Sequence, residues 1–469
     1  MPPLRLLAVS ALFVLPALGQ TSYWIANRAS SDIMRVSEWG TVIGRVPTPT
    51  TLRAAATAPD GKVWITRFGA GTFDVYDPAT NTLTSVAAPS GLPYAIAFDA
   101  QGDAWITTGG QAVHRYGAGL NFVQTVTMPA ANGYGITIDG QGNKWIANRQ
   151  APASVTRIDA AGVATNFPIA GASAAWLPVG VVADYRGIGQ PSRVWVTGDS
   201  DTSLAEIDGA TGATLNLYTL PFGTVASPAT FDRNGRIWVS AISNPNVVQI
   251  DQTNGQVLQS LSFGPSNIAI ATDHHGRIRT TSRVTFTGPG QPCEVRRIDP
   301  ATGALEIPTQ LQQGTSIGYG TQTQLSTLWQ YGLVVNPTGD LDGDGDLNFA
   351  ELLNGTSPTD PGANSLFRVE SFGSTLNGGT ATFEVQSSTL WVVAFALGRI
   401  PPSPLPGFGG FLQLDPATVV LTSAGLGNAS LPIAIPANPA LVGFEFFAQG
   451  VVASGLGFDF KNLTGMKVW

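Results

Sequence analysis

The densest chemical signal in the sequence is an acidic run, DLDGDGDLNFAE, at residues 340–351. Counted from its first residue, oxygen-bearing side chains fall at positions 1, 3, 5, 7, 9 and 12, with Gly345 at position 6. This is the spacing of a twelve-residue calcium loop, in which a hard divalent cation takes oxygen ligands and glycine permits a sharp turn. Without a cation, such close carboxylates repel one another. The sequence predicts a Ca²⁺ site with these ligands: Asp340, Asp342, Asp344, Asp346, Asn348 and Glu351.

The residues around the acidic run indicate what kind of loop it is. Pro337 and Gly339 precede it and exclude an entering helix, while Gly355 and Pro358 end any helix that follows. A calcium sensor needs two helices to swing, so a switch is not expected. The segment resembles the calcium-binding linkers of the thrombospondin type 3 and dockerin-like class. The alternative is a solvated acidic linker.

Other residues that could do chemistry are few. The chain has three histidines, His114, His274 and His275, and one cysteine, Cys293. No histidine lies beside Cys293 in the sequence, so a small residue in or next to a strand is a better interpretation than a nucleophile. One cysteine also excludes an internal disulfide.

The composition points to turn-rich β-structure. Only 12% of the 469 residues are charged, and there are 55 glycines and 33 prolines. The net charge is −7 and there is no basic run, which argues against nucleic acid and anionic membranes as partners.

The first nineteen residues have the features of a secretory signal peptide. An apolar run, residues 6–18, follows Arg5, and small residues at Ala17 and Gly19 suit cleavage before Gln20. The run is too short to span a bilayer, and no later stretch is long and apolar enough. We expect an exported protein without a membrane span, secreted or in the periplasm or at the cell surface.

An internal repeat fills the first two thirds of the chain. The pentapeptide WIANR occurs at residues 24–28 and 145–149, and its tryptophan recurs at spacings of 40, 41, 40, 50, 43 and 41 residues. The aligned positions are Trp24, Trp64, Trp105, Trp145, Trp195, Trp238 and, in a seventh copy, Arg279. A period near 40 with four short strands per unit is typical of a β-propeller blade, and the tryptophans are expected in the blade core.

Two turns recur along the repeat, each in several of its units. The first begins with Asp and ends with Gly, as in DAQG at 99–102, and the second follows an Ile-Asp pair, as in RIDPATG at 297–303. Six units run from about residue 51 to 314. We expect residues 315–329 to supply an inner strand that closes a seventh blade with residues 22–37. The spacing of 50 places an insertion, DYRGIGQPSR, between the first two strands of the fourth unit.

This repeat, with its D-x-x-G turn, W-I/V-T/A strand and R-I-D-x-x-G turn, resembles the streptogramin (virginiamycin B) lyase family of seven-bladed propellers. The resemblance implies this fold, and for the family's enzymes a metal-assisted site of His and Glu residues. The family blade carries Glu three residues after its tryptophan. Here that position holds no carboxylate: it is Asn27, Arg67, Thr108, Asn148, Gly198, Ala241 and Ser282. The family's catalytic pattern is therefore not found.

A ligand-binding site without catalysis is the other interpretation of the propeller. The first residue of each inner strand is Arg53, Tyr94, Tyr134, Val179, Ser227 or Ile268. Arg53, Tyr94 and Tyr134 come from successive blades, and we expect them to line the central opening with Asn27, Arg67 and Asn148 nearby. Aromatic rings with Arg and Asn suit a polar or carbohydrate ligand. Inner strands that merely plug the channel are the alternative.

The last hundred residues read as strands separated by Pro and Gly, which suggests a β-sandwich. The predicted division is a signal peptide (1–19), a seven-bladed β-propeller (20–337), a calcium-binding EF-hand-like linker (338–364) and a C-terminal β-sandwich (365–469). We expect an all-β bacterial protein, a monomer, that binds a polysaccharide, a small polar ligand or another surface protein. A metal-dependent propeller enzyme, resembling streptogramin lyase or a lactone hydrolase, is the alternative.

Overall fold

The computed structural model describes residues 22–27, 31–37, 42–49, 52–67, 69–184, 192–221, 226–232, 234–241, 246–263, 267–273, 276–282, 294–310, 322–323, 367–372, 380–387, 390–397, 399–403, 408–409, 412–427, 429–434, 437, 445–454 and 457–467. The acidic run, the first nineteen residues, His274, His275 and Cys293 lie outside these ranges. The calcium site, the signal peptide and the domain boundaries therefore stay predictions.

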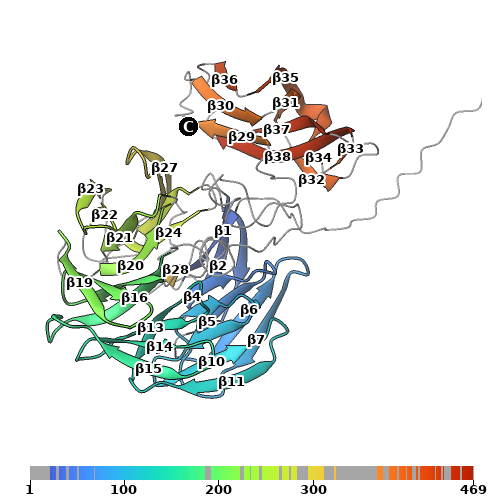
Figure 1. Cartoon of the computed structure of the whole chain (residues 1–469). Helices are drawn as coiled ribbons and strands as arrows, with labels where there is room; N and C mark the ends of the chain where they lie inside the picture. The colour runs from blue at the N-terminus through green and yellow to red at the C-terminus, as the bar shows by residue number, and fades with distance from the viewer. Residues whose placement is uncertain are drawn as a thin grey trace, which may run out of the picture.

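The first two thirds of the chain form a ring of antiparallel sheets, as the repeat predicts (Figure 1). In the described residues one sheet has three strands, β1 (Ser22–Asn27), β2 (Asp32–Ser37) and β3 (Val42–Pro47), and six others contain four consecutive strands each. The innermost strands of neighbouring sheets contact one another in chain order. This arrangement is the seven-bladed β-propeller expected from the spacing of the tryptophans.

The six four-stranded blades follow one another along the chain. Their strands are β4 (Leu52–Thr57), β5 (Val63–Arg67), β6 (Thr72–Asp77) and β7 (Thr82–Ala87); β8 (Ile96–Phe98), β9 (Ala104–Thr107), β10 (Ala112–Tyr116) and β11 (Phe122–Thr127); β12 (Gly133–Ile138), β13 (Lys144–Asn148), β14 (Ser154–Ile158) and β15 (Ala164–Pro168); β16 (Leu177–Ala183), β17 (Arg193–Asp199), β18 (Ser203–Asp208) and β19 (Thr214–Thr219); β20 (Ala226–Phe231), β21 (Ile237–Ala241), β22 (Asn246–Ile250) and β23 (Val257–Ser262); β24 (Asn267–Thr272), β25 (Ile278–Ser282), β26 (Glu294–Ile298) and β27 (Leu305–Gln310). The insertion DYRGIGQPSR lies between β16 and β17, as predicted.

The described part of residues 315–329 pairs differently from the sequence-based expectation. The short strand β28 (Gln322–Thr323) contacts β1 and β24, which places it where the seventh inner strand belongs. It does not hydrogen-bond to β1 in the described residues; it pairs in parallel with β4, Gln322 opposite Ala54. Because β4 is the innermost strand of its own sheet, its inner edge has backbone groups free to accept this partner. In the described residues β28 therefore pairs with β4 and not with the N-terminal strands; the rest of residues 315–329 lies outside the described ranges, so the predicted strand pairing of the seventh blade stays a prediction.

The recurring Asp-x-x-Gly turns connect the two inner strands of a blade. In the turn after β8, the amide of Gly102 donates to the Asp99 carbonyl, and the amide of Asp99 donates to the Asp103 carbonyl. Gly102 has φ +79°, a left-handed conformation that favours glycine. The Asp99 carboxylate accepts the amides of Gln101 and Asp103, so one side chain holds the whole turn.

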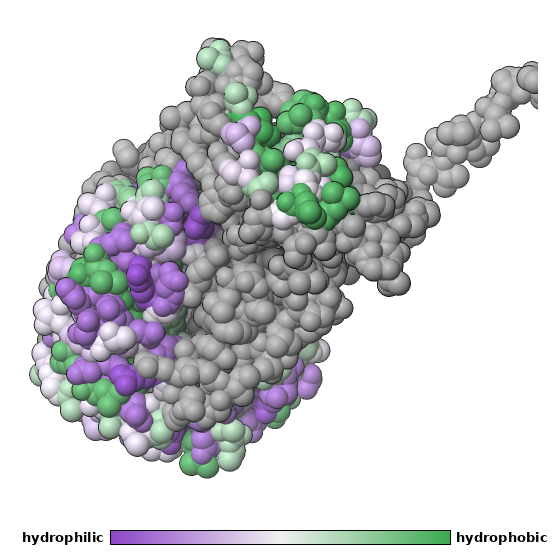
Figure 2. Space-filling model, turned by 45° about the horizontal axis from the view of Figure 1, so that its top comes forward, coloured by the Kyte–Doolittle hydropathy of each residue, from purple (hydrophilic) through white to green (hydrophobic). Residues whose placement is uncertain are grey.

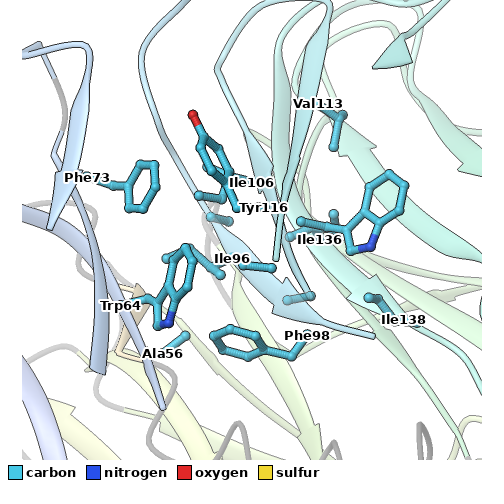
Figure 3. Packing of buried hydrophobic residues seen from close by; sticks show 14 of the residues in the cluster. Ala56, Trp64, Phe73, Ile96, Phe98, Ile106, Val113, Tyr116, Ile136 and Ile138 are labelled. Carbon is cyan, nitrogen blue, oxygen red and sulfur yellow. The ribbon is translucent and has the colours of Figure 1, made fainter. Parts of the chain in front are cut away.

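The recurring tryptophans form the blade cores and are not a surface platform. Trp64, Trp105, Trp145, Trp195 and Trp238 are all 0 or 1% exposed. Figure 3 shows one such core, where Trp64 stacks on Phe73 at 5.2 Å and meets the edge of Phe98 at 5.9 Å. Phe98 comes from the next blade, so each tryptophan binds its own blade to a neighbour. Burying such large side chains stabilises the blades and the contacts between them.

The C-terminal strands form a β-sandwich. The described strands are β29 (Phe367–Phe372), β30 (Thr380–Ser387), β31 (Leu390–Ala396), β32 (Arg399–Ser403), β33 (Phe408–Gly409), β34 (Leu412–Leu414), β35 (Val419–Leu426), β36 (Ala429–Ala434), β37 (Glu445–Ser454) and β38 (Gly457–Lys467), with one short helical turn, η2 (Pro416–Thr418). One sheet has the order β29-β30-β36, and the other has the order β33-β38-β37-β31-β35. Phe383 of the first sheet packs against Phe395 of the second at 5.0 Å, in a core that includes Trp391.

Several apolar side chains of this sandwich are exposed to solvent. Leu390 and Val392 of β31 and Val420 and Leu426 of the edge strand β35 are all more than a third exposed. Figure 2 shows apolar residues gathered on this domain, whereas the described propeller surface in the same view is largely polar. None of the helices in the described residues is long and apolar enough to cross a membrane.

Candidate ligand-binding site at the inner strands

The inner strands share an irregularity at the residue predicted to line the opening. The register of β4 shifts between Leu52 and Ala54, which leaves Arg53 as an extra residue opposite β5. Comparable shifts occur in β12, β16, β20 and β24, next to or at the aligned positions. A β-bulge of this kind turns a side chain away from the direction that strand alternation would give it. In these five blades, the bulge gives one side chain of the inner strand a different direction from that of its neighbours.

Arg53, Tyr94 and Tyr134 meet at this level of the ring. The guanidinium carbon of Arg53 lies 4.5 Å from the ring centroid of Tyr94 and 4.6 Å from that of Tyr134. The two rings are 4.6 Å apart and inclined by 54°. Arg53 is 5% exposed, whereas both tyrosines are partly exposed. The sequence placed these three residues on one sector of the opening, and the structure brings them into contact; their role in binding stays a prediction.

Two threonines that the sequence analysis did not single out hold the tyrosines in place. The Thr66 hydroxyl donates to the carbonyl of Tyr94 at 2.7 Å and accepts the amide of Ala54 at 3.1 Å. In the next blade the Thr107 hydroxyl donates to the carbonyl of Tyr134 at 2.8 Å and accepts the amide of Ala95 at 3.1 Å. Each hydroxyl thus satisfies an inner-strand amide and ties it to the following blade. In the sequence, this role is indicated by the threonine that recurs two residues after the repeated tryptophan.

Gly109 supports the ring of Tyr94. A Cβ atom at Gly109 would lie 2.7 Å from Cε2 of Tyr94, closer than any side chain allows, and φ is +67°. Burial raises the pKa of Tyr94 above its usual value, and its hydrogen bond with Tyr134 acts in the same direction, while the charge of Arg53 partly offsets both. The Tyr94 hydroxyl therefore stays protonated at neutral pH and is a hydrogen-bonding group.

A second cation approaches the same tyrosines. The guanidinium carbon of Arg149 lies 5.4 Å from the ring centroid of Tyr134. Its Nη2 and Nε donate to Oδ2 of Asp199 at 2.6 and 3.0 Å. Burial lowers the pKa of Arg149, but the hydrogen bond and charge of Asp199 outweigh it and raise the pKa. Arg149 is the last residue of the repeated WIANR pentapeptide, and this repeat was the only feature of the sequence that drew attention to it.

Two of the other predicted lining residues, Asn148 and Arg67, contact side chains of the outer strands of their own blades. The amide of Asn148 donates to side chains of β14 and β15, among them Thr156 and Asn166 at 3.0 Å each, so it faces the outer strands. Arg67 donates to Thr72 at 3.0 Å and its Nε lies 3.8 Å from Asp74, both on β6. The side chain of Asn27 lies outside the described part of the structure.

His114 has a structural role. It is fully buried on β10, and its ring nitrogens contact the Thr125 hydroxyl and the Ser90 carbonyl, each at 2.8 Å. Because a carbonyl only accepts, Nε2 carries a proton and donates it to Ser90, while Nδ1 is hydrogen-bonded to the Thr125 hydroxyl. Within the described ranges, no three His, Cys, Asp or Glu side chains come close enough to hold a metal ion.

The positions where the lyase family carries Glu are occupied by residues with other tasks. The Thr108 hydroxyl donates to the Ala112 carbonyl at 2.7 Å. At Gly198 a Cβ atom would lie 2.4 Å from Nε1 of Trp176, so the indole fills the space of a side chain. Ala241 is fully buried. The side chains of Asn27 and Ser282 lie outside the described part.

Comparisons with known proteins give similar folds at low identity. No protein-family model matches the chain, and no curated protein matches its sequence. The structure is similar to virginiamycin B lyase from Staphylococcus aureus, with 17% identity and a TM-score of 0.49 over 56% of this chain and 92% of that one. It is similar to a functionally unknown protein from Desulfotomaculum acetoxidans, with 15% identity and a TM-score of 0.49 over 65% and 97% of the two chains. A third similar structure is dihydro-heme d1 dehydrogenase, with 13% identity and a TM-score of 0.44 over 66% and 76%.

Identities and TM-scores this low carry no argument about activity. The propeller fold of this chain rests on the strand pairing and on the contacts between successive inner strands.

Proposed function

We propose that this protein is an exported binding protein whose propeller takes a polar ligand at Arg53, Tyr94 and Tyr134. The observation that carries the proposal is the packing of one buried guanidinium against two partly exposed tyrosine rings from successive blades. Partly exposed aromatic rings with polar tips are the groups that contact sugars and similar polar molecules. A polysaccharide, a small polar ligand or another surface protein is the expected partner.

The support around the two rings favours binding over a plugged channel. The carbonyls of both tyrosines are held by hydroxyls of the preceding blades, and the ring of Tyr94 lies against Gly109. Rings fixed in this way lose little conformational entropy when a ligand arrives. Side chains that only fill a channel need no fixed position, whereas these hydrogen bonds and the contact with Gly109 restrict the positions of two polar aromatic residues.

A glycan and small-molecule binding screen tests the proposed function. The full chain and the variants Tyr94→Ala and Tyr134→Ala are screened, with Phe122→Ala as a control that removes an exposed aromatic ring from the outermost strand β11. Loss of binding in both tyrosine variants, with binding kept in the control and unfolding temperatures close to that of the parent chain, supports the site. Binding that survives both substitutions contradicts it.

We also propose that the run at residues 340–351 binds Ca²⁺ and stiffens the link between propeller and sandwich. The spacing of its six oxygen-bearing residues supports this, and a dissociation constant of about 10⁻⁴ to 10⁻³ M suits an exported module. Thermal unfolding of the full chain, with calcium and with a chelator, tests it. We expect calcium to raise the unfolding temperature, and to have no effect on a chain carrying Asp342→Asn and Asp344→Asn together. Equal shifts in both chains contradict the proposal.

A further inference from the structure

The guanidinium of Arg53 is enclosed without an acidic partner. The residue is 5% exposed, and its contacts are the faces of the Tyr94 and Tyr134 rings. Over the described residues, no carboxylate forms an ion pair with it and no group accepts a hydrogen bond from it. A buried cation normally has such a partner, because water no longer solvates the charge.

Two other buried or half-buried arginines in this propeller have the partner that Arg53 lacks. Arg279 donates to Asp273 at 2.8 Å, and Arg149 donates to Asp199 at 2.6 Å. Among the described residues, two guanidinium groups contact the Tyr134 ring, and the one carboxylate paired with either of them is engaged by Arg149. The local excess of one positive charge is centred on Arg53.

The geometry of the contact leaves the donors of Arg53 usable. A guanidinium packed against aromatic rings contacts them through its carbon and its flat face, while its five N–H groups point outward in the plane. Two parallel N–H groups match the two oxygens of a carboxylate, which a hydroxyl of a neutral sugar does not. The ring hydroxyls of Tyr94 and Tyr134 add polar contacts beside it.

We infer that the ligand carries a carboxylate that Arg53 binds, and that the ligand is an acidic saccharide of the uronic acid type. This inference rests on the proposed function, since it names the ligand class of the same site. The sugar contacts the partly exposed tyrosines, and the carboxylate supplies the charge that the protein does not. Arg149, already paired, contributes to the positive potential and is not the main anchor.

Calorimetric titration with matched ligands tests the inference. The probes are tetrasaccharides of galacturonate, mannuronate and glucuronate, each paired with its methyl ester, which keeps the sugar and removes the charge. We expect at least one acid to bind about tenfold or more tightly than its ester, as a charge-assisted pair predicts. We also expect its binding to weaken as salt is added.

Three variants separate charge, geometry and folding. Arg53→Gln is expected to bind acid and ester alike, and Arg53→Lys, which keeps the charge but not the planar fork, to retain part of the preference. Arg45→Gln removes an arginine of the outer strand β3 that pairs with Asp32, and it is expected to keep the acid-to-ester ratio of the parent chain. The unfolding temperatures of all three variants identify any that fails to fold. If Arg53→Gln fails to fold, the inference is tested by the ratio of acid to ester affinity in the parent chain and in Arg53→Lys.

The outcomes distinguish this inference from the proposed function. Equal binding of acids and esters, or binding of neutral glycans alone, would overturn the inference that the ligand carries a carboxylate. If Tyr134→Ala abolishes that binding, the proposed binding site still stands. If no acidic or neutral saccharide binds, both the carboxylate and the carbohydrate ligand are overturned.

Discussion

The indole Nε1 of Trp145 donates a 2.9 Å hydrogen bond to Oδ2 of Asp139, which is fully buried six residues earlier in the chain. The same bond joins Asp99 to Trp105 at 2.8 Å and Asp232 to Trp238 at 2.9 Å. In the seventh copy of the repeat the tryptophan is replaced by Arg279, and its Nε donates to Asp273 at 2.8 Å. In these four blades the turn aspartate is hydrogen-bonded to the core residue, which explains why the two recur six residues apart.

Substitution of Asp139 tests the importance of this hydrogen bond. Its carboxylate accepts two turn amides, the side-chain amide of Asn143 and the indole, so Asp139→Ala leaves four donors without this acceptor, the buried indole among them. We expect a loss of about 3 kcal/mol in the free energy of unfolding, measured with a chemical denaturant. Asp159→Ala, in an exposed turn where the side chain accepts from Val163, is the control and should cost less than about 1 kcal/mol. Equal losses in the two variants would show that the buried indole bond is not important.

The hydroxyl of Thr107 should matter for both stability and binding. Thr107→Val keeps the shape but removes the donor to Tyr134 and the acceptor for Ala95, so we expect a loss of about 1 to 2 kcal/mol. Binding of the ligand should weaken as well, because the backbone of Tyr134 is no longer held. Thr107→Ser retains the hydroxyl and should restore most of both. A serine variant as weak as the valine variant would point to the lost methyl group instead.

Tyr23 gives the propeller a dependence on alkaline pH. Burial raises its pKa to about 12, and Asp273 adds to this effect while Arg279 and Arg297 oppose it. A folded-state pKa above the unfolded value means that the contribution is complete below about pH 10 and is lost as pH rises toward 12. Tyr23→Phe cannot ionise, so the stability of the parent chain relative to this variant should fall by about 2 to 3 kcal/mol over that range. Chemical unfolding of both chains at each pH measures it, and a constant difference would contradict the assignment.

The architecture of the ring could be predicted because it follows from the spacing of repeated residues along the sequence. The distance between tryptophans, the Asp-x-x-Gly turns and the long step before Trp195 all follow from one covalent repeat, and each has its counterpart in the strands. The pairing of β28 with β4 could not be predicted, because hundreds of residues separate the two strands and either neighbour offers a free edge.

The candidate site could be predicted only in part for a similar reason. Counting from the turn glycine found Arg53, Tyr94 and Tyr134, since equivalent residues of successive blades lie at the same level of the ring. The position three residues after the repeated tryptophan gave Asn148, but its amide donates to polar side chains of its own sheet, Thr156 and Asn166 among them. Arg149 lies next to Asn148 and reaches Tyr134 because Asp199, from the following blade, fixes its guanidinium.

The C-terminal sandwich should unfold as a unit distinct from the propeller. Its described strands pair only with one another, and its core centres on Trp391, which is 2% exposed and donates to the Gly427 carbonyl at 2.7 Å. Trp391→Ala should destabilise this unit by about 3 to 5 kcal/mol through the cavity that it leaves. In scanning calorimetry we expect one transition to move to lower temperature while the other stays in place, and Trp238→Ala, in the propeller core, to move the other one. If either substitution shifts both transitions together, the two parts unfold cooperatively, and the independence argued from strand pairing is wrong.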